Sequence, residues 1–210
     1  DLPRIKVISK KLGVTINDVV MAMCSGALRT YLLYLNALPC KPLIAMVPMS
    51  LRQDDSDGGN QITMILANLG THLADPMARL NIIHRSVKNA KDRFSRMSPS
   101  EIMAYSALVY SISGMNLMTG IAPKLQAFNV VISNVPGPKE TMYWNGAELD
   151  GFYPVSIVLD GMALNMTLTS YVDSLEFGLI ACRKALPSMQ RLLGYLDDAL
   201  DELEQAAKLA

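Results

Sequence analysis

A stretch of 22 residues without a single charged side chain lies near the middle of the sequence. Residues 102 to 123 read IMAYSALVYSISGMNLMTGIAP, and Glu101 and Lys124 bound them. A helix of that length would rise about 33 Å, which is close to the thickness of a bilayer core. The stretch is therefore a membrane span, a buried core helix or a wall that holds an apolar ligand.

The order of residues within this stretch argues against a membrane span. The small residues Ala104, Ala107 and Ser111 share one helical face, and methionines and leucines flank that face. Several polar side chains would need partners inside a bilayer, and Gly114 and Gly120 weaken a spanning helix further. We expect one or two buried helices here. The residues alone leave core packing and an apolar ligand wall equally open.

The overall composition is globular, with an apolar bias. Half of the 210 residues are hydrophobic, 18% are charged, and 19 basic residues balance 19 acidic ones. Without a basic cluster, nucleic acid is not expected as a partner. The three cysteines are far apart in sequence, so neither a metal site nor a disulfide framework is predicted. Fourteen methionines suit both a core and a surface that adapts to flexible apolar ligands.

The beginning of the sequence bears on localisation. The residues DLPRIKVISKK contain neither the apolar segment of a signal peptide nor an initiator methionine. We therefore expect a cytoplasmic protein, and we expect this chain to belong to a longer polypeptide.

Helical and strand patterns alternate along the sequence, which predicts an α/β or α+β mixed sheet flanked by helices, in one domain over residues 1–210. Helices are predicted over 3–12, 16–35, 76–96 and 187–207, with one more opening at Ser98-Pro99. Strands are predicted over 42–51, 61–73 and 128–134, and LNMTLTSY with LEFGLIACR predicts a hairpin that has one solvent-facing side. The residues PGPK after the third strand predict a turn.

A search for catalytic chemistry finds little. His72 and His84 are the two histidines, and neither lies in a catalytic or metal-ligand spacing. Both are interpreted as surface or half-buried histidines. The sequence has no nucleophile elbow or phosphate-binding loop, and the acidic run before Gly58-Gly59 does not follow the calcium-binding pattern. The residues alone do not describe a complete catalyst.

Several short segments nevertheless stand out. Thr15 followed by Asp18 resembles a capping box at the start of a buried helix, and NVPGP is compatible with a simple turn. Taken in order, the segments resemble the bacterial wax ester synthase/acyl-CoA:diacylglycerol acyltransferases, over essentially the whole chain and over the C-terminal half of such enzymes. The segments are TINDVV (15–20), VPMSLR (47–52), GN (59–60), NVVISNVPGP (129–138), ALNMTLTSY (163–171) and FG (177–178).

This resemblance implies one lobe of a two-lobe fold like that of chloramphenicol acetyltransferase. It implies transfer of an acyl group from long-chain acyl-CoA to a fatty alcohol or diacylglycerol, with acyl-CoA as substrate and no permanently bound cofactor. The family's H-H-x-x-x-D-G motif is absent from this sequence. We therefore expect no catalytic residue in this chain and a general-base histidine supplied by an N-terminal lobe.

The resemblance also suggests site residues in this half. Asn17 and Asp18 match the family's N-D motif near the active site, and we favour a supporting role for them. Arg52 is either a carboxylate partner across the lobe interface or a solvated strand-end residue. Asn134, Pro136 and Gly137 are expected in a turn that reaches toward the other lobe. Ala104, Ala107, Ser111 and Phe152 are expected to line the acyl pocket.

The expected partners are the N-terminal lobe of the same enzyme and the lipid substrates, with peripheral contact to the inner membrane or lipid inclusions. Two other hypotheses stay open: a non-catalytic lipid-binding or scaffold module, and a condensation-type domain that acts on carrier-protein thioesters. The lipid-binding hypothesis predicts lipid binding by the isolated chain. The condensation-domain hypothesis predicts that carrier-bound substrates outperform CoA thioesters.

Overall fold

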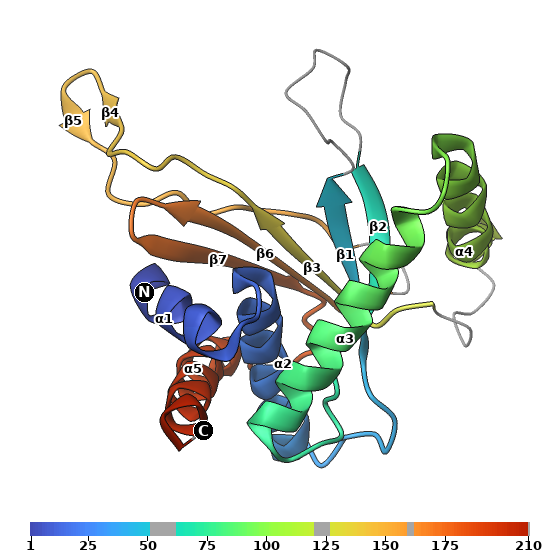
Figure 1. Ribbon diagram of the computed structural model, residues 1–210, viewed down its shortest axis with the longest axis horizontal. Helices are drawn as coiled ribbons and strands as arrows, with labels where there is room; N and C mark the ends of the chain where they lie inside the picture. The colour runs from blue at the N-terminus through green and yellow to red at the C-terminus, as the bar shows by residue number, and fades with distance from the viewer. Residues whose placement is uncertain (51–61, 120–126, 159–161, 210) are drawn as a thin grey trace.

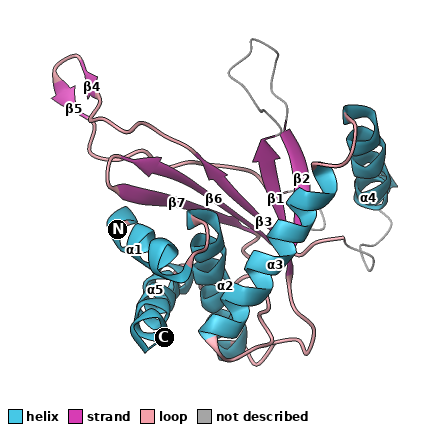
Figure 2. Ribbon diagram, viewed as in Figure 1, coloured by secondary structure: helices cyan, strands magenta, loops and turns pink. Residues whose placement is uncertain are grey.

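The computed structural model describes residues 1–50, 62–119, 127–158 and 162–209 (Figure 1). Its elements are α1 (Leu2–Leu12), α2 (Ile16–Tyr34), β1 (Ile44–Ser50), β2 (Ile62–Asn68), α3 (Pro76–Phe94), α4 (Pro99–Thr119), β3 (Val130–Val135), β4 (Tyr143–Trp144), β5 (Ala147–Glu148), β6 (Leu164–Tyr171), β7 (Ser174–Ala181) and α5 (Arg191–Leu209). A mixed sheet carries α1, α2, α3 and α5 on one face (Figure 2). The predicted mixed α/β class is confirmed.

The sheet has five strands in the order β2-β1-β3-β6-β7. The inner strands β1, β3 and β6 run parallel, while β2 and β7 pair antiparallel at the two edges. The three parallel strands therefore end at the same edge of the sheet. The start of α2 also contributes to this edge.

Helix α2 is the centre of the helical layer. Twelve of its residues between Asp18 and Tyr31 are buried, because α1, α3 and α5 pack around it. The predicted capping box is confirmed: Asp18 N donates to Thr15 Oγ1 at 3.2 Å, and Thr15 N donates to Asp18 Oδ2 at 2.9 Å. Gly13, with φ of 65°, ends α1 as the sequence predicts.

A buried arginine ties the outer helices together. Arg79 on α3 is 3% exposed, and its Nη1 donates to the carbonyls of Leu73 and Ala74. Its Nη2 lies 3.1 Å from the Glu202 carboxylate on α5. Burial lowers the pKa of Arg79, and the Glu202 charge opposes that shift. The close approach of α2, α3 and α5 follows from Gly26, where a Cβ would stand 2.7 Å from Ala199 Cβ.

The expected solvent-facing side of the β6–β7 hairpin is wrong for β6. Asn165, Thr167 and Thr169 are all buried, because residues 151–158 cover the face of the sheet opposite the helices. Asn165 Nδ2 donates to Ser156 Oγ and to the Ile157 carbonyl, both at 3.1 Å. Asn165 therefore holds the covering segment, while Thr167 Oγ1 donates to Asn165 Oδ1 and Thr169 Oγ1 donates to the Val135 carbonyl.

The predicted turn at PGPK is also wrong. The chain passes β3 without a tight turn and continues outward into the β4–β5 hairpin (Figure 1). Asn145 and Gly146, both at positive φ, form the turn of that hairpin, as an Asn-Gly pair favours. The outward course removes the hairpin from the main sheet and leaves Trp144 85% exposed.

Helix α4 lies apart from α1, α2 and α5, beside β2 and the C-terminal end of α3 (Figure 1). Ile102 is buried, but Met103 and Leu108 are 74% and 73% exposed. The expectation of a buried helix is therefore wrong for most of the described side chains of α4. No helix among the described residues is long and apolar enough to cross a membrane.

Several predicted boundaries shift by one or more residues. Strand β2 ends at Asn68 instead of residue 73, because Gly70 takes a positive φ of 61° and redirects the chain. Helix α3 ends at Phe94 instead of residue 96. Helix α5 begins at Arg191 and not at Pro187, whose carbonyl accepts a hydrogen bond from the Tyr31 hydroxyl at 2.5 Å.

Two glycines give a matched test of the covering segment. A Cβ at Gly178 on β7 would stand 1.7 Å from the Pro154 carbonyl oxygen, whereas a Cβ at Gly194 on α5 meets nothing within 4 Å. We expect Gly178→Ala to destabilise the fold by about 1–3 kcal/mol or more, because backbone atoms must move. Gly194→Ala should stabilise it by about 0.5–1 kcal/mol. Urea unfolding measures both, and equal stabilities for the two variants would contradict this packing.

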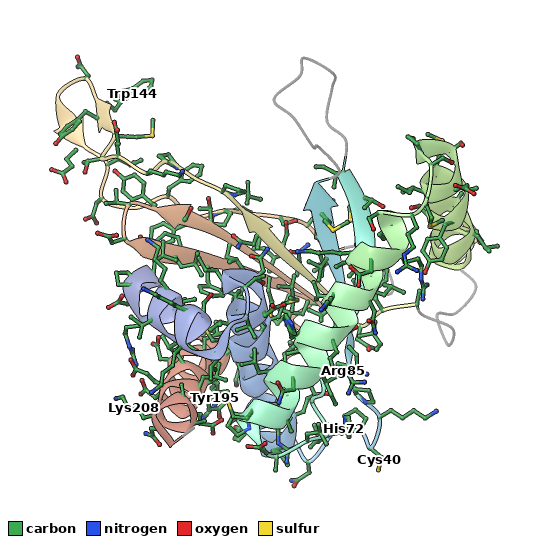
Figure 3. All side chains as sticks on the ribbon, in the orientation of Figure 1. Cys40, His72, Arg85, Trp144, Tyr195 and Lys208 are labelled. Carbon is green, nitrogen blue, oxygen red and sulfur yellow. The ribbon has the colours of Figure 1, made fainter. Side chains whose placement is uncertain are left out.

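Two cysteines should differ sharply in reactivity. Cys24 is fully buried in α2, and burial raises its pKa to about 12, so the reactive thiolate is suppressed. Cys40 is exposed in the loop after α2 (Figure 3). We expect a maleimide to label Cys40 rapidly in native protein and Cys24 only after denaturation. Mass spectrometry of labelled peptides checks this, and native labelling of Cys24 would contradict the buried position.

Candidate active-site edge

A depression of about 360 Å³ lies at the edge where the parallel strands end. It is bounded by the first residues of α1 and α2, by the end of β3 and by the β6–β7 hairpin. Its lining residues are Leu2, Thr15, Ile16, Asn17, Asn134, Pro136, Ser170 and Leu175. Ligands of open α/β sheets bind outside the carboxyl ends of the strands, so this is the place where the fold favours a site.

Two side chains predicted as site residues meet at this edge. Asn134 Nδ2 donates to Asn17 Oδ1 at 2.5 Å, although the two residues are 117 positions apart in sequence. The contact joins the first turn of α2 to the end of β3. Asn17 lies on the solvent side and Asn134 is half-buried, so both amides can also reach a bound molecule.

The neighbouring Asp18 points the other way, into the protein. It is 1% exposed, and its Oδ2 lies 2.9 Å from Thr15 N and 2.9 Å from His84 Nδ1 on α3. In the N-D pair, Asn17 therefore faces the edge while Asp18 holds the helix start. This arrangement favours the supporting role that the sequence suggested for Asp18.

Pro136 and Gly137 follow Asn134 directly. Pro136 lines the depression, and Gly137 N donates to Ser170 Oγ at 3.1 Å. A Cβ at Gly137 would stand 2.0 Å from the Ser170 carbonyl oxygen, so only glycine fits here. Gly137 does not have a positive φ; its role is close approach to β6 and not a turn.

The residues expected to bind the acyl chain lie elsewhere. Ala104, Ala107 and Ser111 are exposed on α4, and Phe152 is 49% exposed in the segment after the hairpin. None of the four lines the depression at the strand ends. Arg52 lies outside the described residues. The described part of this chain therefore does not bring the acyl candidates together with Asn17 and Asn134.

Two further depressions flank the sheet. One of about 240 Å³ lies between β2, α3 and α4 and is lined in part by Phe94, Arg93 and Tyr105. The other, of about 370 Å³, is mostly apolar and lies at the far end of the parallel strands, beside the end of α2. Neither contains a residue that the sequence predicted as part of the site.

The side chains at the candidate edge define what it can do. Amides and hydroxyls line it, from Asn17, Asn134, Thr15 and Ser170, together with apolar groups. These groups can hold and orient a polar reactant by hydrogen bonding, but none of them is a general base at neutral pH. Within the described ranges no cluster of three potential metal ligands occurs.

Sequence reasoning missed His84. It is half-buried as expected, but its pairing with Asp18 joins residues 66 positions apart, and no local pattern signals such a pairing. The lining residues Leu2, Ser170 and Leu175 were missed for the same reason.

Comparison with known proteins shows which family this chain resembles. The model of the WS/DGAT C-terminal domain matches residues 58–204. The chain is 63% identical over 204 residues to the O-acyltransferase WSD of Acinetobacter baylyi, covering 97% of this chain and 44% of that protein. It is 50% identical over 210 residues to a putative diacylglycerol O-acyltransferase of Mycobacterium tuberculosis, covering 99% of this chain and 47% of that protein. The chain thus spans about half the length of these relatives.

Solved structures of known proteins are also similar to this chain. The wax ester synthase/diacylglycerol acyltransferase from Marinobacter aquaeolei VT8 superposes with a TM-score of 0.88 at 52% identity, covering 99% of this chain and 47% of that one. The first condensation domain of the CDA synthetase superposes with a TM-score of 0.52 at 12% identity, covering 97% of this chain and 42% of that one, which shows a shared fold alone. The motif resemblance noted in the sequence is therefore confirmed, and the chain belongs to the WS/DGAT C-terminal domain family.

Proposed function

We propose that this chain supplies the C-terminal half of an O-acyltransferase that moves a long-chain acyl group from acyl-CoA to a fatty alcohol or diacylglycerol. The observation that carries the proposal is the high identity to relatives named as O-acyltransferases, over nearly the whole of this chain. The Asn17–Asn134 contact supports it, because it brings two amide groups together at the carboxyl ends of the strands, the edge where ligands of open α/β sheets bind.

The proposed reaction needs a base from outside this chain. A histidine of the N-terminal half removes the hydroxyl proton of the alcohol as its oxygen attacks the thioester carbonyl carbon. The carbon–sulfur bond then breaks, the ester forms, and the proton ends on the sulfur of CoA. No permanently bound cofactor is needed, and acyl-CoA acts only as substrate.

The N-terminal half, in this proposal, covers the exposed apolar surface of the β4–β5 hairpin and of the segment after it. Tyr143, Trp144, Tyr153, Val155 and Ile157 are between 63% and 85% exposed. Trp144 projects from the far end of the hairpin (Figure 3). An apolar surface of this kind is unusual on an isolated soluble domain and typical of an interface. The relatives' additional length supplies a partner for it.

The acyl chain is proposed to lie along α4. Ala104, Ala107 and Ser111 give this helix a shallow face, and their present exposure leaves that face free to be covered. Phe152 is retained as a second candidate because it is half-exposed on the surface proposed to face the other half.

Peripheral contact with the inner membrane or with lipid inclusions completes the proposal. Fatty alcohols and diacylglycerols reside in lipid, so the enzyme must reach them there. Exposed Met103 and Leu108 on α4 offer apolar contacts for such a surface.

A chimera tests the proposed function. We would join the N-terminal half of the Acinetobacter baylyi relative to this chain and assay ester formation from palmitoyl-CoA with hexadecanol or dioleoylglycerol. We expect CoA-dependent ester formation by the chimera, because 63% identity should preserve the interface between the halves. The intact relative is the positive control, and this chain alone should be inactive.

Other outcomes separate the remaining hypotheses. A folded chimera without ester formation would contradict the acyltransferase proposal. Higher rates with carrier-protein thioesters than with CoA thioesters would favour a condensation-type domain. Fatty-acid binding by the isolated chain, without turnover by the chimera, would favour a lipid-binding module.

The proposed acyl wall makes a separate prediction. Ala107→Ile in the chimera should shift the preference toward shorter acyl chains, because the larger side chain fills pocket volume and one methylene is worth roughly 10- to 200-fold in selectivity. Ser106→Ile on the same helix, on the side away from Ala104, Ala107 and Ser111, is the control. Competition among acyl-CoAs of different lengths measures the profile, and an unchanged profile for Ala107→Ile would remove this residue from the wall.

A further inference from the structure

His84 makes a contact that the proposed reaction does not use. Its Nδ1 lies 2.9 Å from Asp18 Oδ2, and this contact joins the middle of α3 to the first turn of α2. The side chain of Asp18 is 1% exposed and that of His84 is 34% exposed. One partner is therefore fixed inside the protein, while the other reaches it from the surface of the neighbouring helix.

The Asp18 carboxylate depends on few donors. Oδ2 receives the Thr15 backbone N–H and the His84 Nδ1, while the buried Oδ1 has no hydrogen-bond partner among the described atoms. A buried carboxylate with so few donors is costly, and each remaining donor therefore matters. Loss of His84 would leave the carboxylate with only the Thr15 backbone donor of its own helix.

The position of Asp18 connects this contact to the candidate edge. Asn17 precedes Asp18 in the first turn of α2, so the orientation of that turn sets the direction of the Asn17 amide. Asn17 in turn accepts the hydrogen bond from Asn134 at the end of β3. A shift of the first turn would separate the two amides, because the strand is held in the sheet by β1 and β6.

Helix α3 is a firm anchor for this purpose. Arg79 fixes it to α5 through Glu202, and Ile83, which precedes His84, is fully buried in the core. The His84 imidazole is 34% exposed, and it lines a depression of about 150 Å³ together with Asp18, Thr15, Val87, Lys88, Lys91 and Asp92.

We propose that His84 is a positioning residue for the acyl-transfer site: by donating to Asp18 it fixes the first turn of α2 and so aligns Asn17 with Asn134. This inference rests on the proposed function for its effect on turnover. Its structural part, the fixing of the first turn, stands on the described contacts.

The experiment compares three substitutions in the chimera with the Acinetobacter N-terminal half. His84→Leu removes the donor. His84→Asn keeps an N–H donor at the δ position of the side chain. Ile83→Val removes a core methyl group from the same helix without touching Asp18. For each variant we would measure kcat, KM for both substrates, thermal unfolding, and amide hydrogen exchange of peptides covering residues 14–20.

We expect His84→Leu to lower kcat roughly 10- to 100-fold with KM little changed, the size of effect that a small misplacement near reacting groups produces. It should also speed hydrogen exchange in residues 14–20. His84→Asn should restore both measures to within about threefold of the parent, a rescue expected if the lost donor is what matters. Ile83→Val should lower the unfolding temperature but leave kcat and exchange in this segment near the parent values.

The result that overturns the inference is unchanged exchange in residues 14–20 for His84→Leu, or a loss of kcat that His84→Asn does not restore. If the parent chimera makes no ester, the proposed function fails instead. The exchange comparison still decides whether His84 fixes the first turn, so the two failures are distinguishable.

Discussion

The burial of the Asp18 carboxylate at the start of α2 is the constraint on which the candidate site depends. One oxygen of that carboxylate closes the capping box with Thr15 and meets His84 from α3. A buried charge tolerates little movement, since lost donors are not replaced by water. The first turn of α2 is therefore held in one place relative to α3, and with it the Asn17 amide that reaches β3. Residues 15–18 therefore both cap the start of α2 and orient the Asn17 side chain at the strand-end edge.

Buried polar groups are also hydrogen-bonded on the face of the sheet opposite the helices. Residues 151–158 lie over β6 and β7. Ser156 Oγ and the Ile157 carbonyl in this segment accept hydrogen bonds from the buried Asn165 side chain. Two glycines permit this close packing: Gly178 faces the Pro154 carbonyl, and Gly137 faces the Ser170 carbonyl. In the proposed function, the exposed aromatic side chains of the β4–β5 hairpin contact the N-terminal half.

Physical separation of roles explains why this chain carries no complete catalytic set in its described part. The strand-end edge offers amides and hydroxyls, α4 offers an apolar face, and the hairpin offers exposed aromatic side chains, at three separate places. Each feature is incomplete alone. A second lobe that covers all three would join them, which is consistent with a match to a C-terminal domain family and to about half of each relative.

The sequence by itself determined the elements whose signals are local. The capping box at Thr15, the Pro76 helix start, the β6–β7 hairpin and the mixed α/β class follow from neighbouring residues, and so did the family. The Asn145-Gly146 pair is likewise a local signal, for the β4–β5 turn. Tertiary structure alone decided which groups meet: Asn17 with Asn134, Asp18 with His84, and the cover over β6. Those contacts join residues up to 117 positions apart, and their partners are chosen by packing and by the cost of unsatisfied buried polar groups, which no local pattern records.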